Sequence, residues 1–269
     1  MTKVFVTGAF DNLRSPDVRF LQEAGMLGSV CVVLEPDAAI AARTGRPPKF
    51  PEPERRYLLQ SLRYVDSVAE NAGLEDKAVL FDLARPGDRL VTREEDRDSS
   101  LQRPAADLGL EQLAIPNERL AGFPDPDRLP PITRPRVLVT GCYDWFHSGH
   151  VRFFEEVSEL GDLFVVVGHD ANIALLKGQG HPLFSEQERR YLVQSVRFVA
   201  RAMISSGHGW LDAEPEIEQI RPDIYAVNDD GDRPEKRDYC AAHGIEFRVL
   251  RRTPKPGLPR RQSTDLRGF

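Results

Sequence analysis

The sequence predicts an α/β protein built from two tandem copies of one doubly wound parallel-sheet domain. The first observation behind this prediction is an internal repeat within the 269 residues. The segment 54–65 recurs at 188–199 with nine of twelve positions identical, and a shorter match relates 6–11 to 139–144. The second observation is that short apolar runs alternate with amphipathic helical patterns, which is typical of parallel sheets with crossover helices.

The first strand of each copy is expected at 3–6 and at 136–139, where a β-branched run ends near a glycine. The second strand is expected at 30–34 and at 163–167. These runs are continuously apolar, as in strands that are buried on both faces of a sheet. Both copies therefore begin with the same pair of neighbouring buried strands.

Helices are expected between these strands. In the second copy a set of apolar residues falls on one helical face, opposite several glutamates. These apolar residues are Val151, Phe154, Val157 and Leu160. A further helix is expected over 188–199, and later strands at 224–227 and 247–250. Ligands of such folds bind beyond the carboxyl ends of the strands, so the chemistry is expected there.

The repeat divides the chain into two expected domains, 1–133 and 134–269. The segment 116–135 contains six prolines. Such a segment is interpreted as a linker that starts at about residue 116, or as a strap across the second copy.

Composition excludes several classes of protein. The chain has 36 Lys and Arg against 42 Asp and Glu, a net charge of -6, so a general nucleic-acid binder is not expected. It contains no apolar run long enough to span a membrane and no signal-peptide pattern. The three cysteines form no CxxC pair, which favours a reducing, cytoplasmic location and argues against structural zinc.

The residues that follow the strand at 136–139 are the strongest functional signal. Two histidines, His147 and His150, stand three apart, so on the first turn of a helix they project to one side. The backbone N–H groups of that turn are expected to be unpaired and to face the same crevice. Surface or metal-binding histidines are the alternative. The position directly after a strand and Gly141 favours a cradle for a phosphoryl group instead.

The first copy lacks this arrangement. Arg14 and Asp17 stand where the second copy has its two histidines, and Pro16 stands in place of Gly149. An aspartate repels phosphate, and proline removes an N–H donor. All six histidines of the chain lie in the second copy. The first copy is therefore expected to be degenerate.

The pattern Gly-x-Tyr-Asp-x-x-His-x-Gly-His at 141–150 resembles the cytidylyltransferase-like nucleotidyltransferases, whose domains are Rossmann-like. These include ethanolamine-phosphate and glycerol-3-phosphate cytidylyltransferases and the adenylyltransferase that forms ADP-heptose. The resemblance continues through the lysine–glycine loop at 176–182, the segment 228–230 and the segment 262–266. The tandem layout resembles ethanolamine-phosphate cytidylyltransferase, although there the first copy is the active one.

The resemblance implies a reaction and a set of site residues. A phosphate oxygen of an acceptor attacks the α-phosphorus of a nucleoside triphosphate, and pyrophosphate leaves. The implied catalytic residues are His147, His150 and Lys177. The implied nucleotide-binding residues are Thr140, Gly141, Cys142, Tyr143, Gly149, Asn228, Asp230, Arg260, Arg261, Ser263 and Thr264. The implied substrate-binding residues are Asp144, Lys177 and Arg189. Mg²⁺ is expected to bind through the nucleotide phosphates, with no metal site of the protein's own.

Two departures from the family pattern concern nucleotide binding. Asn228 replaces the glycine that the family carries before two aspartates. The arginine of the last motif is shifted, so either Arg260 or Arg261 is expected to contact the triphosphate.

CTP is the favoured donor and a small phosphate or phosphonate monoester the favoured acceptor. The alternatives are an ATP-dependent adenylyltransferase for a sugar phosphate and a non-catalytic nucleotide sensor or scaffold. No nucleic-acid or membrane partner is expected. The two copies would form an internal pseudo-dimer, as a monomer or as a homodimer.

Overall fold

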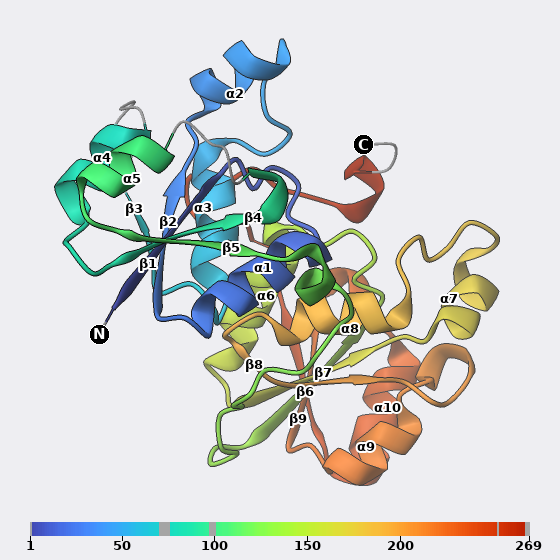
Figure 1. Ribbon diagram of the computed structural model, residues 1–269. Coiled ribbons are helices and arrows are strands. Elements are labelled where there is room, and N and C mark those ends of the chain that lie inside the picture. The colour runs from blue at the N-terminus through green and yellow to red at the C-terminus, as the bar shows by residue number, and fades with distance from the viewer. Residues whose placement is uncertain (1, 70–75, 97–100, 252, 267–269) are drawn as a thin grey trace. The chain divides into compact units, whose positions relative to one another are not determined.

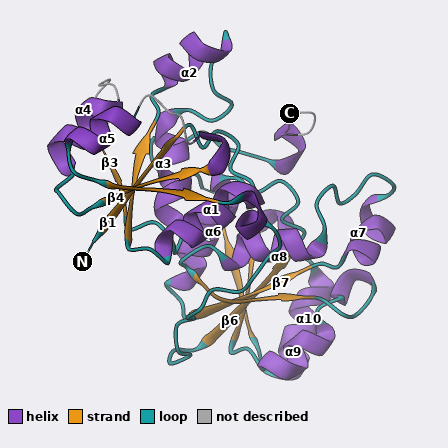
Figure 2. Cartoon of the chain, viewed as in Figure 1, coloured by secondary structure: helices purple, strands orange, loops and turns teal. Residues whose placement is uncertain are grey.

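The structure is a computed structural model that describes residues 2–69, 76–96, 101–251 and 253–266. It divides into two compact units, Met1–Phe123 and Pro124–Phe269. In its described part each unit contains a five-stranded parallel sheet with flanking helices (Figures 1 and 2). The predicted fold class, two doubly wound α/β domains, is confirmed.

In the first unit the strands are ordered β3-β2-β1-β4-β5. A core of apolar side chains, including Phe5, Val33 and Leu90, lies under the helices α4 and α5. The strands are β1 (Lys3–Gly8), β2 (Ser29–Leu34), β3 (Ser67–Ala69), β4 (Arg89–Arg93) and β5 (Glu111–Ile115). The helices are α1 (Ser15–Gly25), α2 (Asp37–Thr44), α3 (Glu52–Ser61), α4 (Asp76–Leu83) and α5 (Gln102–Asp107), with short 3-10 turns η1 (Glu94–Asp96) and η2 (Asn117–Leu120).

In the second unit the order is β10-β9-β6-β7-β8, which is the order of the first unit taken from the opposite edge. The strands are β6 (Arg136–Gly141), β7 (Asp162–Val167), β8 (Val199–Ile204), β9 (Ile224–Asn228) and β10 (Glu246–Leu250). The helices are α6 (Ser148–Ser158), α7 (Asp170–Lys177), α8 (Glu186–Gln194), α9 (Glu214–Ile220) and α10 (Pro234–His243), with 3-10 turns η3 (Gly209–Leu211), η4 (Asp229–Gly231) and η5 (Ser263–Leu266).

The apolar strands of the second unit are covered on both faces, as their composition predicts. On one face, Leu138, Phe164 and Tyr225 pack with residues of α9 and α10. Figure 1 shows α6 and α8 on the other side of the sheet, where the apolar face of α6 is fully buried. Because all the strands are parallel, the ends of β6, β7 and β9 meet at one edge. That edge carries the candidate site.

The helix predicted over 188–199 is wrong at its C-terminal end. Helix α8 stops at Gln194, and Val199 begins strand β8, which pairs with β7. The apolar periodicity continues past the helix because Val196 and Val199 are both fully buried. The amide N–H of Ala202 donates to Gln194 Oε1 (2.7 Å), so the end of the helix is fastened to the strand that follows it.

The part of the proline-rich segment that follows Phe123 packs along the second unit. The division between the two compact units falls between Phe123 and Pro124. Asp125 is ion-paired with Arg190 at 2.6 Å, and the Arg201 guanidinium donates to the Pro130 carbonyl at 3.0 Å. These contacts fasten residues 125–130 to the second unit.

Within the described ranges, the structure contains no helix whose length and apolar character together would suit it to a membrane span.

Candidate active site

A cavity of about 250 Å³ lies at the carboxyl ends of β6 and β9 in the second unit. Much of the predicted site lines it, although these residues come from five separate segments of the chain. The predicted residues on its wall are Thr140, Gly141, Cys142, Tyr143, Asp144, His150, Lys177, Asn228, Asp230 and Ser263. The loops after β6 and β9, the end of α7 and the start of η5 therefore converge on one cavity, as parallel strands require.

The two histidines lie against each other at the start of α6. Their rings are stacked with centroids 4.0 Å apart and planes 21° apart. His147 is fully buried and is the N-cap residue of α6, since its Nδ1 accepts the Gly149 N–H at 3.0 Å. An Nδ1 that accepts a hydrogen bond is unprotonated, so the neutral ring carries its proton on Nε2. His147 Nε2 lies 3.4 Å from Ser263 Oγ, beside the cavity.

The helix turn itself offers fewer free donors than the sequence predicts. The amide of Gly149 donates to the His147 ring, and the amide of His150 donates to the His147 carbonyl at 3.0 Å. The expectation that these two N–H groups face the crevice unpaired is therefore wrong, because the histidine side chain caps its own helix. A Cβ at Gly149 would lie only 2.9 Å from the His147 ring, so glycine makes room for this cap.

Asp144 connects two loops of the site. Its Oδ1 accepts the amides of Leu183 (2.8 Å) and Phe184 (3.0 Å), which lie beyond the lysine–glycine loop. The carboxyl group thereby fastens the loop after β6 to the segment that follows Lys177. Asp144 is almost wholly buried yet lines the cavity, so its position is set by the fold, and one oxygen is left over from these contacts.

Arg189 does not reach the cavity as a phosphate ligand. It is fully buried, and its guanidinium donates to the carbonyls of Phe184, Cys142 and Gly168 at 2.6–2.9 Å. It also pairs with Asp170 at 2.7 Å. The predicted substrate contact is thus replaced by a structural one. The guanidinium holds together the loops that follow β6 and β7, which build the wall of the site.

The cationic side chains of the cavity include one that sequence reasoning missed. Lys177 is exposed at the end of α7, and Lys236 reaches the cavity from the first turn of α10. Burial lowers the pKa of Lys236, with the charge of Arg233 acting in the same direction. Its ammonium lies 5.5 Å from the centre of the Tyr225 ring. The sequence feature that could have identified Lys236 is its position in a helix that begins shortly after Asp229 and Asp230.

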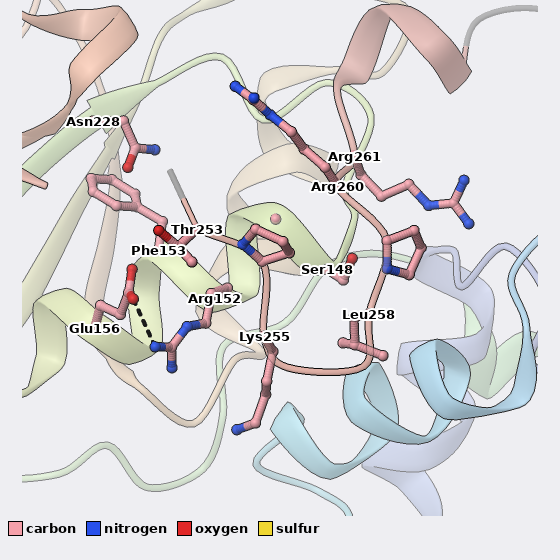
Figure 3. Close-up of a pocket in the computed structure, with 13 residues that line it drawn as sticks. Ser148, Arg152, Phe153, Glu156, Asn228, Thr253, Lys255, Leu258, Arg260 and Arg261 are labelled. Carbon is pink, nitrogen blue, oxygen red and sulfur yellow. Dashed lines mark ion pairs between the residues drawn. The ribbon is translucent and has the colours of Figure 1, made fainter. Parts of the chain in front are cut away.

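The C-terminal arginines lie apart from this cavity. Arg260 and Arg261 line a second, much smaller cavity of about 20 Å³ against α6, and their side chains extend away from each other (Figure 3). Arg152 on the same wall is ion-paired with Glu156 at 2.7 Å. In this arrangement neither arginine lines the cavity that holds His150 and Lys177. The side chain of Thr264 lies outside the described part of the chain.

The equivalent position in the first unit is closed by an ion pair. Asp17, the counterpart of His150, accepts a hydrogen bond from Arg93 at 2.6 Å. Arg93 ends β4 where Asn228 ends β9, and its guanidinium also lies over the Phe20 ring at 5.1 Å. The ion pair of Asp17 and Arg93 thus stands where the second unit has His150 and Asn228.

This ion pair yields a pH-dependent prediction. Burial raises the pKa of the Asp17 carboxyl above its ordinary value of 3.8, and the Arg14 amide and the Arg93 charge oppose this rise. Arg93→Ala is therefore expected to raise the pKa of Asp17 further. A native-state pKa above the unfolded value means that the first unit loses stability as pH rises from 3.8 through the native pKa. In the variant that loss extends to higher pH.

The measurement is the carboxyl ¹³C chemical shift of Asp17 against pH, in wild type and in Arg93→Ala. Asp17→Asn identifies the signal and removes the titration. An unchanged or lower pKa for Asp17 in Arg93→Ala would mean that the ion pair does not form in solution.

Comparisons with known proteins match the second unit of the chain. A family model described as cytidylyltransferase-like matches residues 138–238, which lie in the second unit. The FAD synthase of Aciduliprofundum boonei is 39% identical over 119 residues, which cover 43% of this chain and 76% of that protein. The FAD synthase of Methanocella paludicola is 32% identical over 135 residues, covering 49% and 93%.

Two further similarities are shorter or weaker. The bifunctional protein HldE of Syntrophotalea carbinolica is 35% identical over 95 residues, which cover 35% of this chain and 19% of that protein. A solved structure of a lipopolysaccharide core biosynthesis protein from Thermoplasma volcanium covers 46% of this chain and 99% of that one, with 26% identity and a TM-score of 0.38.

Proposed function

Because the chain belongs to the cytidylyltransferase-like family of nucleotidyltransferases, we propose that its second unit transfers the adenylyl group of ATP to the phosphate of a small acceptor. A phosphate oxygen of the acceptor forms a bond to the α-phosphorus of ATP. The bond from that phosphorus to the bridging oxygen breaks, and the bridging oxygen keeps the electron pair and leaves with pyrophosphate. The observation that carries this proposal is the stacked pair His147 and His150, of which His150 lines a cavity that Lys177 also lines.

The roles of the side chains follow from their chemistry. Both reactants are anions, so the site must supply positive charge and hydrogen-bond donors where they meet. His147 Nε2 is fixed as a donor by the helix cap, and His150 lines the cavity beside it. Lys177, which lines the same cavity, places a point charge on a long stem, suited to an acceptor phosphate. These groups hold the two phosphates together and offset the charge that builds up on the transferring group.

The relatives favour ATP over the CTP that the motif alone suggests. FAD, the product named in FAD synthase, contains an adenylyl group. Adenine and cytosine both present an exocyclic amino group, so a cytidylyl donor is the competing outcome in the test below.

The same relatives suggest a flavin mononucleotide acceptor, and one feature of the chain supports an acceptor with a large apolar ring. Three leucines near Lys177 are unusually exposed: Leu175 by 72%, Leu176 by 55% and Leu183 by 56%. Exposed apolar side chains beside a polar cavity are typical of surfaces that cover a ligand. A sugar phosphate would leave these leucines in contact with water.

Mg²⁺ is expected with the triphosphate. The described residues contain no group of three or more His, Cys, Asp or Glu side chains placed to hold a metal ion. The ion would therefore be held mainly by phosphate oxygens and water. Asp144 Oδ2 fits as one ligand, since it is buried at the cavity and has no hydrogen-bond partner in the described part of the chain. When bound, the ion would neutralise charge on the departing pyrophosphate.

We also infer that the first unit is a degenerate copy of the second. Arg55 is fully buried and donates to the carbonyls of Phe50, Ala9 and Glu35 and to Asp37, as Arg189 does to the equivalent groups. The scaffold is thus retained, while Arg14 and Asp17 replace the two histidines and Asp17 pairs with Arg93.

The decisive test combines ligand-induced stabilisation with product formation. Thermal unfolding is measured with ATP, CTP, GTP or UTP in the presence of Mg²⁺, and pyrophosphate release is measured with FMN or glycerol 3-phosphate as acceptor. We expect ATP to give the largest stabilisation, about 2.7 kcal/mol at a hundred times its Kd, and pyrophosphate to appear only when an acceptor is present.

Each other outcome has a defined meaning. A larger shift with CTP, together with CTP-dependent pyrophosphate release, would replace adenylyl transfer by the cytidylyl transfer that the motif suggests. Tight binding of a nucleotide without release of pyrophosphate for either acceptor would favour a nucleotide sensor. Equal shifts with all four nucleotides would contradict any base preference.

A further inference from the structure

Three residues that line the cavity each carry a buried polar atom with no hydrogen-bond partner among the described residues. These atoms are the Tyr143 hydroxyl, Asp144 Oδ2 and Asn228 Oδ1. A buried polar group without a partner destabilises a fold, and most such groups in native proteins are paired. Three of them on a single cavity indicate that a ligand completes their hydrogen bonds.

The first unit serves as an internal control, because it has the same arrangement without the unpaired atoms. Phe10 stands where Tyr143 stands and carries no hydroxyl. Asp11 uses both oxygens, accepting the amides of Lys49 (2.7 Å) and Phe50 (2.8 Å), whereas Asp144 accepts two amides on one oxygen. Arg93, at the position of Asn228, is paired with Asp17. The fold alone therefore does not require the three unpaired atoms.

The ring of Tyr143 is accounted for by packing. Its backbone has φ of 54°, close to the 45° of Phe10, and its ring lies over Gly141, where a Cβ would come within 2.7 Å. The ring packs on Phe154 at 5.2 Å and meets the His150 ring edge-on at 5.3 Å. Phe10 adopts the same backbone conformation at the equivalent position of the first unit. The fold therefore needs the aromatic ring at this position but not the hydroxyl of Tyr143.

Resting on the function proposed above, we propose that the Tyr143 hydroxyl donates a hydrogen bond to a phosphate oxygen of the bound substrates. Phosphate only accepts hydrogen bonds, and the Tyr143 ring lies against the His150 ring in the lining of a cavity that Lys177 also lines. A tyrosine hydroxyl is protonated at neutral pH and is therefore a donor. The oxygen belongs to ATP or to the acceptor phosphate, and the two sources are separated by experiment.

The test compares Tyr143→Phe with wild type in the full chain. The readouts are kcat, the KM values for ATP and FMN, the Kd for α,β-methylene-ATP by calorimetry, and the urea midpoint. We expect the variant to be at least as stable as wild type, and kcat/KM to fall about 10- to 100-fold, the usual effect of losing a hydrogen bond to a charged group. A rise in KM for ATP alone identifies the nucleotide phosphate, and a rise for FMN alone identifies the acceptor phosphate.

Tyr225→Phe is the matched control for loss of a buried hydroxyl. The Tyr225 hydroxyl is bonded to Thr140 Oγ1 at 2.8 Å, so its removal leaves a polar group unpaired and lowers the urea midpoint. Tyr143→Phe is expected to give the opposite sign in stability. A loss of stability parallel to the loss of activity would show that the Tyr143 hydroxyl is structural and would overturn the proposal, as would unchanged kinetic constants.

The outcomes also separate this inference from the proposed function. If wild type binds α,β-methylene-ATP but releases no pyrophosphate, the proposed function fails, and a weaker Kd in Tyr143→Phe still supports the phosphate contact. If wild type is active and the variant matches it in every constant, the contact alone fails. If wild type binds neither the analogue nor FMN, both are overturned.

Discussion

His150→Ala is expected to lower turnover about 10²- to 10³-fold while the second unit stays folded, since this is the usual cost of removing one preorganised donor to a transition state. The imidazole lines the cavity, and its ring is stacked on that of His147. Alanine removes the donor but leaves the helix cap in place. Turnover is measured as pyrophosphate release with ATP and an acceptor, and the fold by circular dichroism.

His147 needs two variants, because its side chain has two tasks. His147→Ala removes both the imidazole and the cap that accepts the Gly149 N–H. His147→Asn keeps an effective N-cap but supplies nothing equivalent to the Nε2 donor. Both variants are expected to lose turnover about 10²- to 10³-fold, as expected for a lost donor, and only His147→Ala is expected to lose about 1 kcal/mol of stability as well.

Arg14→Ala, at the corresponding N-cap position of the first unit, is the matched control and should leave turnover unchanged. Near-normal turnover in His150→Ala or in His147→Asn would contradict the role assigned to that imidazole.

The largest effect on stability is expected for Arg189→Met. Its guanidinium is fully buried and pairs with Asp170 and three backbone carbonyls, so methionine leaves these acceptors without partners. Each buried carbonyl that is left without a donor costs about 1–3 kcal/mol, whereas Asp170, whose side chain is 43% exposed, can be solvated by water. The loops after β6 and β7 lose a shared anchor as well. Turnover of the remaining folded protein is expected to fall about 100-fold, as for small misplacements of reacting groups.

Arg55→Met provides the matched control in the first unit, where the same network is present. Both tryptophans of the chain, Trp145 and Trp210, belong to the second unit, so tryptophan fluorescence reports the unfolding of that unit selectively. Urea unfolding followed in this way should shift strongly in Arg189→Met and remain unchanged in Arg55→Met. Retained stability together with a raised KM in Arg189→Met would instead restore the direct phosphate contact that the sequence suggests.

The equivalent residues Arg55 and Arg189 show that a sequence alone does not predict the role of a buried arginine. The resemblance implies that Arg189 is a substrate ligand, whereas the structure shows the same buried network around Arg55 in a copy without histidines. The identity of the residue does not distinguish these roles, because a guanidinium suits a phosphate and a set of carbonyls equally well. The partners of Arg189 come from positions up to 47 residues distant along the chain, and only folding brings them together.

The predicted C-terminal end of the helix over 188–199 is wrong for a similar reason. Apolar side chains at Val196 and Val199 fit the helical period, yet Val199 is buried as the first residue of a strand. A short apolar run suits either structure, and the choice depends on whether a neighbouring strand is present to pair with it.

The amino-acid sequence by itself determined the doubly wound fold of both halves and predicted a site after residue 139, because strand runs, glycines and histidine spacing can be recognised within short windows of sequence. Tertiary structure decided which polar groups remain available to a ligand. The N–H groups of Gly149 and Arg189 donate hydrogen bonds within the protein. The Tyr143 hydroxyl has no hydrogen-bond partner among the described residues. The physical reason is that hydrogen-bond satisfaction depends on partners far apart in the chain, and each donor that the fold uses is lost to the substrate.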